Sequence, residues 1–244
     1  GSVLIEYIMS QLKEKGLMPE HPVMFNTVVT SDLGEKIAAK YGVETEKTLT
    51  GFKFIGEKVA KYEINNEKQY VFGYEESYGS LIKPFVRDKD APQACLMLAE
   101  AACFYKAQGK TLVDVLNGLY DEFGAYEESQ TSLTLAGAEG AAKIQKILGD
   151  LRTSQLADIA GTEVIRFEDY KECRIVENGT ESELSGFTKS DVLKYYLKDG
   201  SWIAIRPSGT EPKCKFYYCI KGTSVADAKA KTKEYQEAVA KLIQ

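Results

Sequence analysis

The chain has 244 residues, of which 44% are hydrophobic and 27% are charged, and its formal net charge at pH 7 is −5. This length and composition are typical of one or two globular domains and exclude disordered, collagenous and repeat-array chains. Basic residues are not gathered into a patch, which argues against a nucleic-acid reader. No apolar run approaches the roughly 18 residues of a membrane span, and the first residues lack a signal-peptide pattern. We therefore expect a soluble, cytoplasmic protein that binds neither nucleic acid nor membrane.

Strands alternate with helices over the first half of the chain. The sequence predicts helices over 3–12, 32–42, 51–62, 90–109 and 111–123, and strands over 23–29, 43–49 and 70–72. Asp32 with Glu35 and Thr111 with Asp114 have capping-box spacing, and Asp90 precedes a proline in a first helical turn. This alternation predicts an α/β domain with a mixed sheet over residues 1–124.

The pattern changes after Gly124. The sequence predicts a strand over 126–135, a helix over 138–151, strands over 164–167, 171–176, 192–197, 201–206 and 214–220, and a last helix from Ser224 to Leu242. Strands in succession with helices at each end predict a smaller α+β domain over residues 125–244, in which helices pack on an antiparallel sheet.

The cysteines predict a reducing compartment. They are five in number and scattered, with no C-x-x-C pair, which favours small buried apolar residues over disulfides or a metal site. Cys95 and Cys103 lie in an alanine-rich helical stretch. Cys214 and Cys219 lie on opposite faces of a predicted strand. The single histidine, His21, excludes a histidine-rich zinc site, and its loop position favours a surface residue over a catalytic base.

The loop between the last two predicted strands, residues 206–213, reads R-P-S-G-T-E-P-K and carries groups that can donate hydrogen bonds to a phosphate. These donors are the guanidinium fork of Arg206, the hydroxyls of Ser208 and Thr210, and the backbone around Gly209. Lys215 follows on the next strand. The loop predicts a weak phosphate site, although the same residues also suit a plain tight connection between strands.

A second segment, residues 73–79, reads G-Y-E-E-S-Y-G and leaves the end of an apolar strand, where ligands of open α/β sheets often bind. Glu75 can accept hydrogen bonds from two vicinal hydroxyls, and Ser77 can both donate and accept, which suits a polyol. Two neighbouring acids on a loop usually point in different directions, so both rarely serve one centre. Metal binding, acid–base catalysis and a solvated acidic loop stay open from these residues alone.

The segments T-G-F-K-F-I-G (50–56), G-Y-E-E-S-Y-G (73–79), R-D-K-D-A (87–91) and R-P-S-G-T-E-P-K (206–213) occur in this order. Together they resemble the α-D-phosphohexomutase family, and most of all its long bacterial phosphoglucomutase/phosphomannomutase branch. The resemblance covers essentially the whole chain. Members of the family have four domains, and this chain resembles the third and fourth, joined near residue 124.

The resemblance implies a role for each matching residue. Glu75 and Ser77 match residues that bind sugar hydroxyls. Thr50 and Gly51 match the loop that senses the orientation of the sugar. The match to the clamp on the phosphate that is not transferred consists of Arg206, Ser208, Gly209 and Thr210. Lys215 lies where many members carry a second phosphate-binding arginine, and Lys89 matches a lysine found near the ligand in some members.

The resemblance also implies a mechanism whose central parts are absent from this sequence. In the family, a phosphoserine phosphorylates the hexose phosphate, and the bisphosphate, glucose 1,6-bisphosphate for glucose, reorients before it returns its other phosphoryl group. The serine motif T-A-S-H-N-P and the magnesium motif D-G-D-G-D-R do not occur here. We therefore expect a substrate-binding C-terminal fragment of a phosphohexomutase, an intramolecular phosphotransferase of the isomerase class. It is expected to hold no catalytic residue and no metal ligand.

Such a fragment is expected to be inactive without the missing N-terminal domains. The sequence starts abruptly inside a helical pattern, after a Gly1-Ser2 pair that suits the scar of a cleaved tag, and this start also suggests a fragment. The alternatives are a stand-alone sugar-phosphate-binding or regulatory module, and a structural domain whose loops have drifted. Phosphoglucosamine mutases typically read E-Q-S where this chain has E-E-S at 75–77, which disfavours an amino sugar. Glucose phosphate is favoured, but the motifs do not separate glucose from mannose, and a pentose phosphate stays open.

Overall fold

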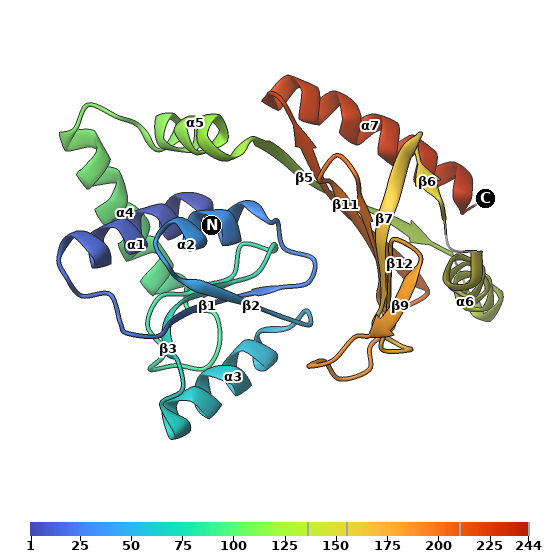
Figure 1. Ribbon diagram of the computed structural model, residues 1–244, viewed down its shortest axis with the longest axis horizontal. Coiled ribbons are helices and arrows are strands. Elements are labelled where there is room, and N and C mark those ends of the chain that lie inside the picture. The colour runs from blue at the N-terminus through green and yellow to red at the C-terminus, as the bar shows by residue number, and fades with distance from the viewer. Residues whose placement is uncertain (136, 155, 210, 244) are drawn as a thin grey trace. The chain divides into compact units, whose positions relative to one another are not determined.

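A computed structural model of the chain describes residues 1–135, 137–154, 156–209 and 211–243 (Figure 1). The chain divides into two units, Gly1–Gly124 and Ala125–Gln244, and each is described by itself. Within the described residues, no helix combines the length and the apolar character that crossing a membrane requires.

The first unit alternates helices and strands. Its helices are α1 (Ser2–Glu14), α2 (Leu33–Lys40), α3 (Phe52–Asn65), α4 (Ala91–Ala107) and α5 (Leu112–Phe123). Its strands are β1 (Pro22–Thr27), β2 (Glu44–Thr48), β3 (Gln69–Tyr74) and β4 (Ser80–Leu81). The sheet order is β2-β1-β3-β4, in which β1 pairs in parallel with β2 and β3, and β4 runs antiparallel to β3. The predicted α/β unit with a mixed sheet is confirmed.

Helices cover both faces of this sheet (Figure 1). On one face, Phe52 and Ile55 of α3 pack against Phe25 of β1. On the other face lie α1 and α2, and Met9 and Ile37 of these helices are fully buried. A central strand covered on both faces is expected to be largely apolar, which explains the run of hydrophobic residues from Val23 to Phe25 at the start of β1.

In the first unit, the helix starts follow the predicted caps in two of three cases. The side chain of Asp90 accepts the N–H of Gln93 at the start of α4, and Thr111 and Asp114 form a reciprocal capping box at the start of α5. The capping box predicted at Asp32 is wrong, because its side chain does not cap α2. Instead, Oδ1 of Asp32 lies 2.8 Å from Nζ of Lys47, and this ion pair takes the carboxylate away from the helix end.

The second unit is built on an antiparallel sheet. Its strands are β5 (Ala125–Thr134), β6 (Asp158–Ile159), β7 (Thr162–Asp169), β8 (Arg174–Glu177), β9 (Thr180–Glu183), β10 (Leu193–Leu197), β11 (Trp202–Pro207) and β12 (Lys213–Gly222). The strand order is β5-β12-β11-β10-β7-β8-β9, and β6 pairs with β7. Helices α6 (Gly137–Ser154) and α7 (Val225–Leu242) lie on one face (Figure 1), where Leu148 and Tyr235 join a core of strand residues. The predicted α+β unit is confirmed.

The strand predicted over 171–176 starts later than expected. Oδ1 of Asp169 accepts the backbone N–H groups of Lys171 and Glu172 at 3.0 and 3.2 Å, and Cys173 has a φ of 53°. These bonds hold the backbone in a turn, so β8 begins only at Arg174.

Three of the five cysteines depart from the prediction of burial, and one of these, Cys173, is half-buried. Cys95 and Cys103 are exposed on α4, whereas Cys214 and Cys219 are buried as predicted. Cysteine and alanine occur on every side of α4, so the residue pattern alone did not indicate which side faces the core. Burial raises the pKa of the Cys214 thiol to about 12, which keeps it protonated and unreactive at neutral pH.

Candidate functional site

The three parallel strands of the first sheet end at one edge. β1 ends at Thr27, β2 at Thr48 and β3 at Tyr74, and the pairing register aligns these ends. The segments that leave this edge include residues 50–51 after β2 and residues 75–79 after β3. Because ligands of open α/β sheets bind at the carboxyl ends of strands, this edge is the candidate binding site of the first unit.

Glu75 joins the two segments directly. Its Oε1 accepts the backbone N–H of Gly51 at 2.8 Å, and the residue is only 7% exposed. Gly51 has a φ of 118°, a conformation that favours glycine, and it immediately precedes α3. The positive end of the α3 dipole therefore faces the Glu75 carboxylate and stabilises its charge. Glu75 is thus held in place by the protein itself.

Lys89 brings a cation to the same place. Its Nζ lies 3.7 Å from Oε2 of Glu75 and 2.8 Å from Oδ1 of Asp88. The hydrogen bond to Asp88 is the main cause that raises the pKa of Lys89, so the amine stays charged. The side chain passes close over Gly79, where a Cβ atom would overlap Cδ of Lys89. The absence of a side chain at position 79 therefore lets the lysine reach Glu75.

Thr50 and Ser77 flank this cluster without entering it. Thr50 is half-buried beside Gly51, and Ser77 is exposed in the turn that closes through the bond from Glu75 N–H to Gly79 C=O at 2.8 Å. Neither hydroxyl forms a hydrogen bond with another residue in the part of the chain that the structure describes. Both hydroxyls are therefore available to an incoming polar molecule.

Glu76 has a structural task that the sequence reasoning missed. Its Oε2 accepts the hydroxyls of Thr27 and Thr30 at 3.0 and 3.4 Å, at the end of β1. Burial raises the pKa of Glu76, and the threonine bonds oppose that rise only in part. Glu75 and Glu76 thus point to different partners, and Glu76 fastens the loop to the sheet edge. Two threonines just after an apolar strand were the signal that could have indicated this anchor.

The second unit places Arg206 and Lys215 opposite each other. They are paired neighbours in the antiparallel register of β11 and β12, which brings Cβ atoms to about 4.5–5.5 Å. Ile205 and Phe216, the adjacent residues, belong to the core under α6 and α7. Alternation therefore turns Arg206 and Lys215 to the face that these helices do not cover. Among the described residues, neither cation has an ion-pair partner.

The β11–β12 loop closes through its own backbone. The N–H of Ser208 donates to the carbonyl oxygen of Lys213 at 2.7 Å, and Oγ of Ser208 accepts the N–H of Glu211 at 3.2 Å. Gly209 is exposed at the end of the loop. The remaining predicted site residue, Thr210, lies outside the described residues. The loop therefore holds the strand ends that carry Arg206 and Lys215 next to each other.

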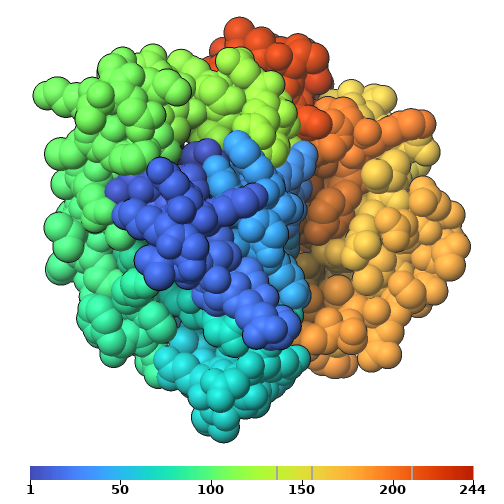
Figure 2. Space-filling model, turned by 60° about the vertical axis from the view of Figure 1, so that its left-hand side comes forward, coloured from blue at the N-terminus to red at the C-terminus, as the bar shows by residue number. Residues whose placement is uncertain are grey.

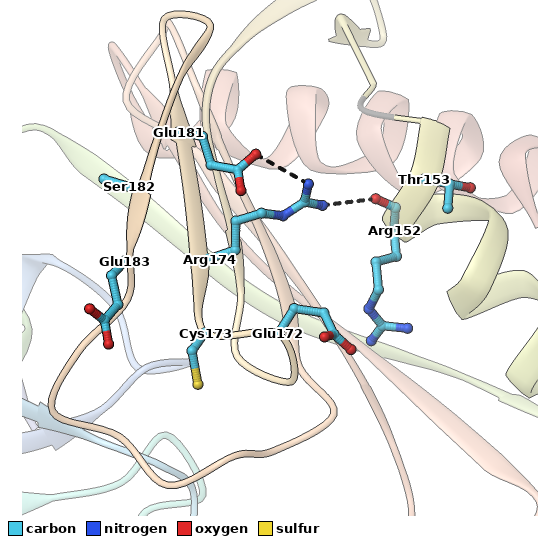
Figure 3. A pocket seen from close by; sticks show the side chains of 8 residues that line it. All are labelled: Arg152, Thr153, Glu172, Cys173, Arg174, Glu181, Ser182 and Glu183. Carbon is cyan, nitrogen blue, oxygen red and sulfur yellow. Dashed lines mark hydrogen bonds and ion pairs between the residues drawn. The ribbon is translucent and has the colours of Figure 1, made fainter.

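A hollow of about 810 Å³ lies elsewhere in the second unit, between the end of α6 and β8–β9 (Figure 3). Its lining consists of Arg152, Thr153, Glu172, Cys173, Arg174, Glu181, Ser182 and Glu183. Arg174 lies 3.6 Å from a carboxylate oxygen of Glu181, and Arg152 pairs with Asp169 and Asp191. Both arginines are therefore already engaged, and the hollow contains no residue of the predicted sites.

A metal site is not formed by the side chains that the structure describes. Within residues 1–135, 137–154, 156–209 and 211–243, no group of three or more histidine, cysteine, aspartate or glutamate side chains is placed to hold an ion. Asp88, next to Lys89 in the sequence, is engaged by Lys89. The described residues therefore do not fit a magnesium ion.

Two family models match this chain, one over each unit. Residues 1–123 match the family model of the phosphoglucomutase/phosphomannomutase alpha/beta/alpha domain III, and residues 137–242 match the model of the C-terminal domain. The chain belongs to the phosphoglucomutase/phosphomannomutase family, and the resemblance read from its motifs is confirmed.

Curated relatives include phosphoglucomutases from staphylococci. The protein of Staphylococcus aureus (strain bovine RF122 / ET3-1) is 36% identical over 233 residues, which are 95% of this chain and 41% of the relative. That of Staphylococcus haemolyticus (strain JCSC1435) is 36% identical over 222 residues, which are 90% of this chain and 39% of the relative. The chain thus spans about two fifths of the length of these relatives.

Solved structures share the fold. The open form of the exocytosis-sensitive phosphoprotein parafusin, a phosphoglucomutase from Paramecium, matches 99% of this chain and 42% of its own, with a TM-score of 0.65 at 20% identity. A phosphoglucomutase/phosphomannomutase family protein from Burkholderia thailandensis matches 99% of this chain and 41% of its own, with a TM-score of 0.55 at 16% identity. At these identities the likeness concerns the fold alone.

Proposed function

We propose that this chain is the substrate-binding C-terminal part of a mutase that interconverts hexose 1-phosphate and hexose 6-phosphate, with glucose favoured. The route is phosphoryl transfer through a phosphoserine and a bisphosphorylated sugar. The curated relatives, which are named phosphoglucomutases, support this activity for the longer protein. In this proposal residues 1–124 recognise the sugar and residues 125–244 hold the phosphate that is not transferred.

The observation that carries the proposal is the pairing of Arg206 with Lys215. Two cations directly opposite each other in a sheet are destabilising, and the described residues offer them no counter-charge. A phosphate dianion would relieve the repulsion and accept charge-assisted hydrogen bonds, each worth about 1.5–3 kcal/mol. Ser208, Gly209 and Thr210 would add donors from the loop. This is the chemistry of a phosphate clamp.

The first unit supplies the chemistry for sugar hydroxyls. Glu75 is an acceptor held in place by Gly51, and Ser77 and Thr50 are hydroxyls without partners among the described residues. Lys89 adds a cation beside Glu75. Because Thr50 and Ser77 flank the pair of Glu75 and Lys89, acceptors and donors are available on neighbouring segments to bind vicinal hydroxyls of a sugar ring in either orientation.

The chain alone is expected to bind and not to turn over its substrate. The motif that carries the phosphoserine is absent from the sequence, and the described residues hold no magnesium site. Mg²⁺ and glucose 1,6-bisphosphate would be cofactors of the longer protein, and its N-terminal domains would bring the phosphoryl-transfer groups. No step of the transfer is assigned to residues of this chain.

An NMR titration with glucose 1-phosphate and with glucose 6-phosphate tests this proposal. We expect shifts in 50–51, 73–79 and 206–215 with both ligands, and affinity at least about tenfold weaker in Arg206→Ala, the loss of one charge-assisted bond. Lys221→Ala, which removes a cation farther along β12, is the matched control and leaves the affinity unchanged. If no shifts appear at ligand concentrations up to about tens of millimolar, the dissociation constant is far above the millimolar value expected of a useful site. That result contradicts the binding role. Mutase turnover above background contradicts the expected inactivity.

A further inference from the structure

The row that Arg206 and Lys215 form across the second sheet continues onto a third strand. Strand β5 pairs with the other edge of β12, and its register sets Ser132 directly opposite Lys215. Opposed residues of antiparallel strands have Cβ atoms about 4.5–5.5 Å apart, a distance that long side chains span. In Figure 2 orange atoms from the part of the chain that includes β10 and β11 lie at the surface of the second unit. Arg206, Lys215 and Ser132 are therefore successive neighbours on β11, β12 and β5.

The side chain of Ser132 lies on the same face of the sheet as the two cations. Other residues of β5 turn to the helix side, where Oγ of Ser129 accepts a hydrogen bond from Gln236 of α7 at 3.0 Å and Leu133 packs against the core. Because side chains alternate along a strand, Ser132 turns to the face that α6 and α7 leave uncovered. It is exposed, and among the described residues its hydroxyl has no hydrogen-bond partner. This hydroxyl is available to a molecule bound beside Lys215.

The charge pattern of β5 indicates which kind of molecule fits there. Both acidic residues of β5 lie in its first half, whereas its second half sets Ser132 opposite Lys215 and Thr134 opposite Lys213. An acid opposite a lysine would stabilise the sheet as an ion pair, but a hydroxyl does not neutralise the charge. Within the described part of the chain, Arg206, Lys213 and Lys215 form no ion pair. The strand therefore leaves the cations to an external anion and adds hydroxyl donors beside them.

We propose that Ser132 belongs to the phosphate site and donates a hydrogen bond to the phosphate group held by Arg206 and Lys215. This inference rests on the proposed function, in which the second unit binds the phosphate that is not transferred. A phosphate group carries three strong acceptor oxygens, enough for one bond to each side chain of the row. The β11–β12 loop approaches the phosphate from the strand ends, and Ser132 approaches it from the far side of Lys215.

A titration of the 244-residue chain, followed by NMR at constant ionic strength, tests this contact. The two ligands are inorganic phosphate and glucose 1-phosphate, and constant ionic strength keeps the screening of the cations equal. Ser132→Ala should weaken both affinities by the same factor, about three- to tenfold, the loss of one hydrogen bond. Ser132→Thr keeps the hydroxyl and should retain most of the affinity. Ser129→Ala, the same change on the other face of β5, is the matched control and leaves both affinities unchanged.

A second variant separates the contact from any effect on the fold. Ser132→Asp places a carboxylate opposite Lys215, which favours a cross-strand ion pair and repels a bound anion. The urea midpoint of this variant should be at least that of the parent chain, whereas its affinity for both ligands should fall at least about tenfold. Added salt should narrow the difference in affinity. A weaker affinity in a chain of undiminished stability cannot result from unfolding.

The possible results distinguish this inference from the proposed function. If Arg206→Ala weakens binding and Ser132→Ala does not, the phosphate does not reach β5, and the proposed function still stands. A loss confined to glucose 1-phosphate would assign the hydroxyl to the sugar and overturn the contact with phosphate. Unchanged affinity in Ser132→Asp would show that the anion binds away from this row. If the parent chain binds neither ligand, both the inference and the proposed function are wrong.

Discussion

Glu75 and Glu76 are neighbours in sequence and have different tasks in the structure. Glu75 accepts the Gly51 N–H and lies beside Lys89, whereas Glu76 turns to the hydroxyls of Thr27 and Thr30. In the proposed function the first carboxylate accepts sugar hydroxyls, whereas the second fastens the loop that carries the first. Their separate functions can be measured with substitutions of one residue at a time.

Glu75→Ala should both destabilise the chain and remove sugar binding. The change leaves the half-buried N–H of Gly51 without its acceptor, and because a fully buried unsatisfied donor costs about 1–3 kcal/mol, we expect a loss near the lower end of that range in the free energy of unfolding. Glu75→Gln keeps an acceptor oxygen of similar shape and should lose less stability. Urea unfolding of both variants, with a glucose 1-phosphate titration, gives the comparison. Equal stability of Glu75→Ala and the parent chain would show that this bond is not formed in solution.

Glu76 should make stability depend on pH. Burial raises its pKa in the folded state above the ordinary value of 4.5, so the folded protein favours the protonated form. This contribution to stability is complete below the unfolded-state pKa and is lost as pH rises through the raised folded-state pKa. The difference in unfolding free energy between the parent and Glu76→Gln should therefore change from about pH 4.5 upward, the parent losing more.

A pH titration of the Glu76 carboxyl carbon, followed by NMR, measures the pKa of Glu76 in the folded protein directly. Thr27→Val removes a donor that favours the ionised form, so it should raise the pKa of Glu76 further. A carboxyl that titrates at its ordinary value in both proteins would rule out the buried anchor.

At the scale of elements, strand register determines the candidate phosphate site. The pairing of β11 with β12 puts Arg206 opposite Lys215, and a slip of one residue would turn Lys215 to the other face. The site therefore needs no cavity of its own. It needs a loop between the two strands that preserves this register.

Lys215→Met should stabilise the free chain and weaken its affinity for phosphate. Removal of one of two like charges that face each other across strands relieves roughly 0.2–1 kcal/mol, and the gain should shrink as salt screens the repulsion. Urea unfolding with and without inorganic phosphate measures both effects. Lys221→Met, at the other end of β12, is the control and should change neither. A Lys215→Met chain that is less stable without phosphate would mean that the two cations do not repel.

The elements that were predicted and those that were missed differ in their source of stability. Strands such as β1 and β11 carry apolar residues that a core requires, so their sequences indicate them. The edge strand β9 is exposed and polar throughout, and only its hairpin with β8 defines it. The turn residues Asn178 and Gly179, both with positive φ, were a hairpin signal that the sequence reasoning did not use.

The features of the candidate site also divide into those that the sequence predicted and those that it did not. Motifs indicated Glu75, Gly51, Arg206 and Lys215 because their chemistry is visible in single residues. The Glu75–Gly51 bond and the tie between Glu76 and β1 join segments 24 and 49 residues apart, and no local pattern specifies such contacts.

At the scale of the whole molecule, the two units have separate sheets and separate cores. The single tryptophan, Trp202, is buried in the second unit, so its fluorescence reports on that unit alone. We expect urea unfolding curves from tryptophan fluorescence and from far-UV circular dichroism not to coincide. Glu75→Ala, a change in the first unit, should shift only the circular dichroism transition of that unit and leave the tryptophan fluorescence curve unchanged. Coincident curves that shift together would mean that the units unfold as one.

The spacing of the two exposed thiols on α4 has a practical consequence for the isolated chain. Eight residues of helix separate the Cα atoms of Cys95 and Cys103 by about 12 Å, well beyond the roughly 7 Å limit for a disulfide. Air oxidation therefore cannot join Cys95 to Cys103 within one molecule, and a disulfide between two exposed α4 thiols must join different molecules. Because each molecule carries two exposed thiols on α4, oxidised samples should contain disulfide-linked linear polymers as well as dimers. A reducing agent should convert both to monomers.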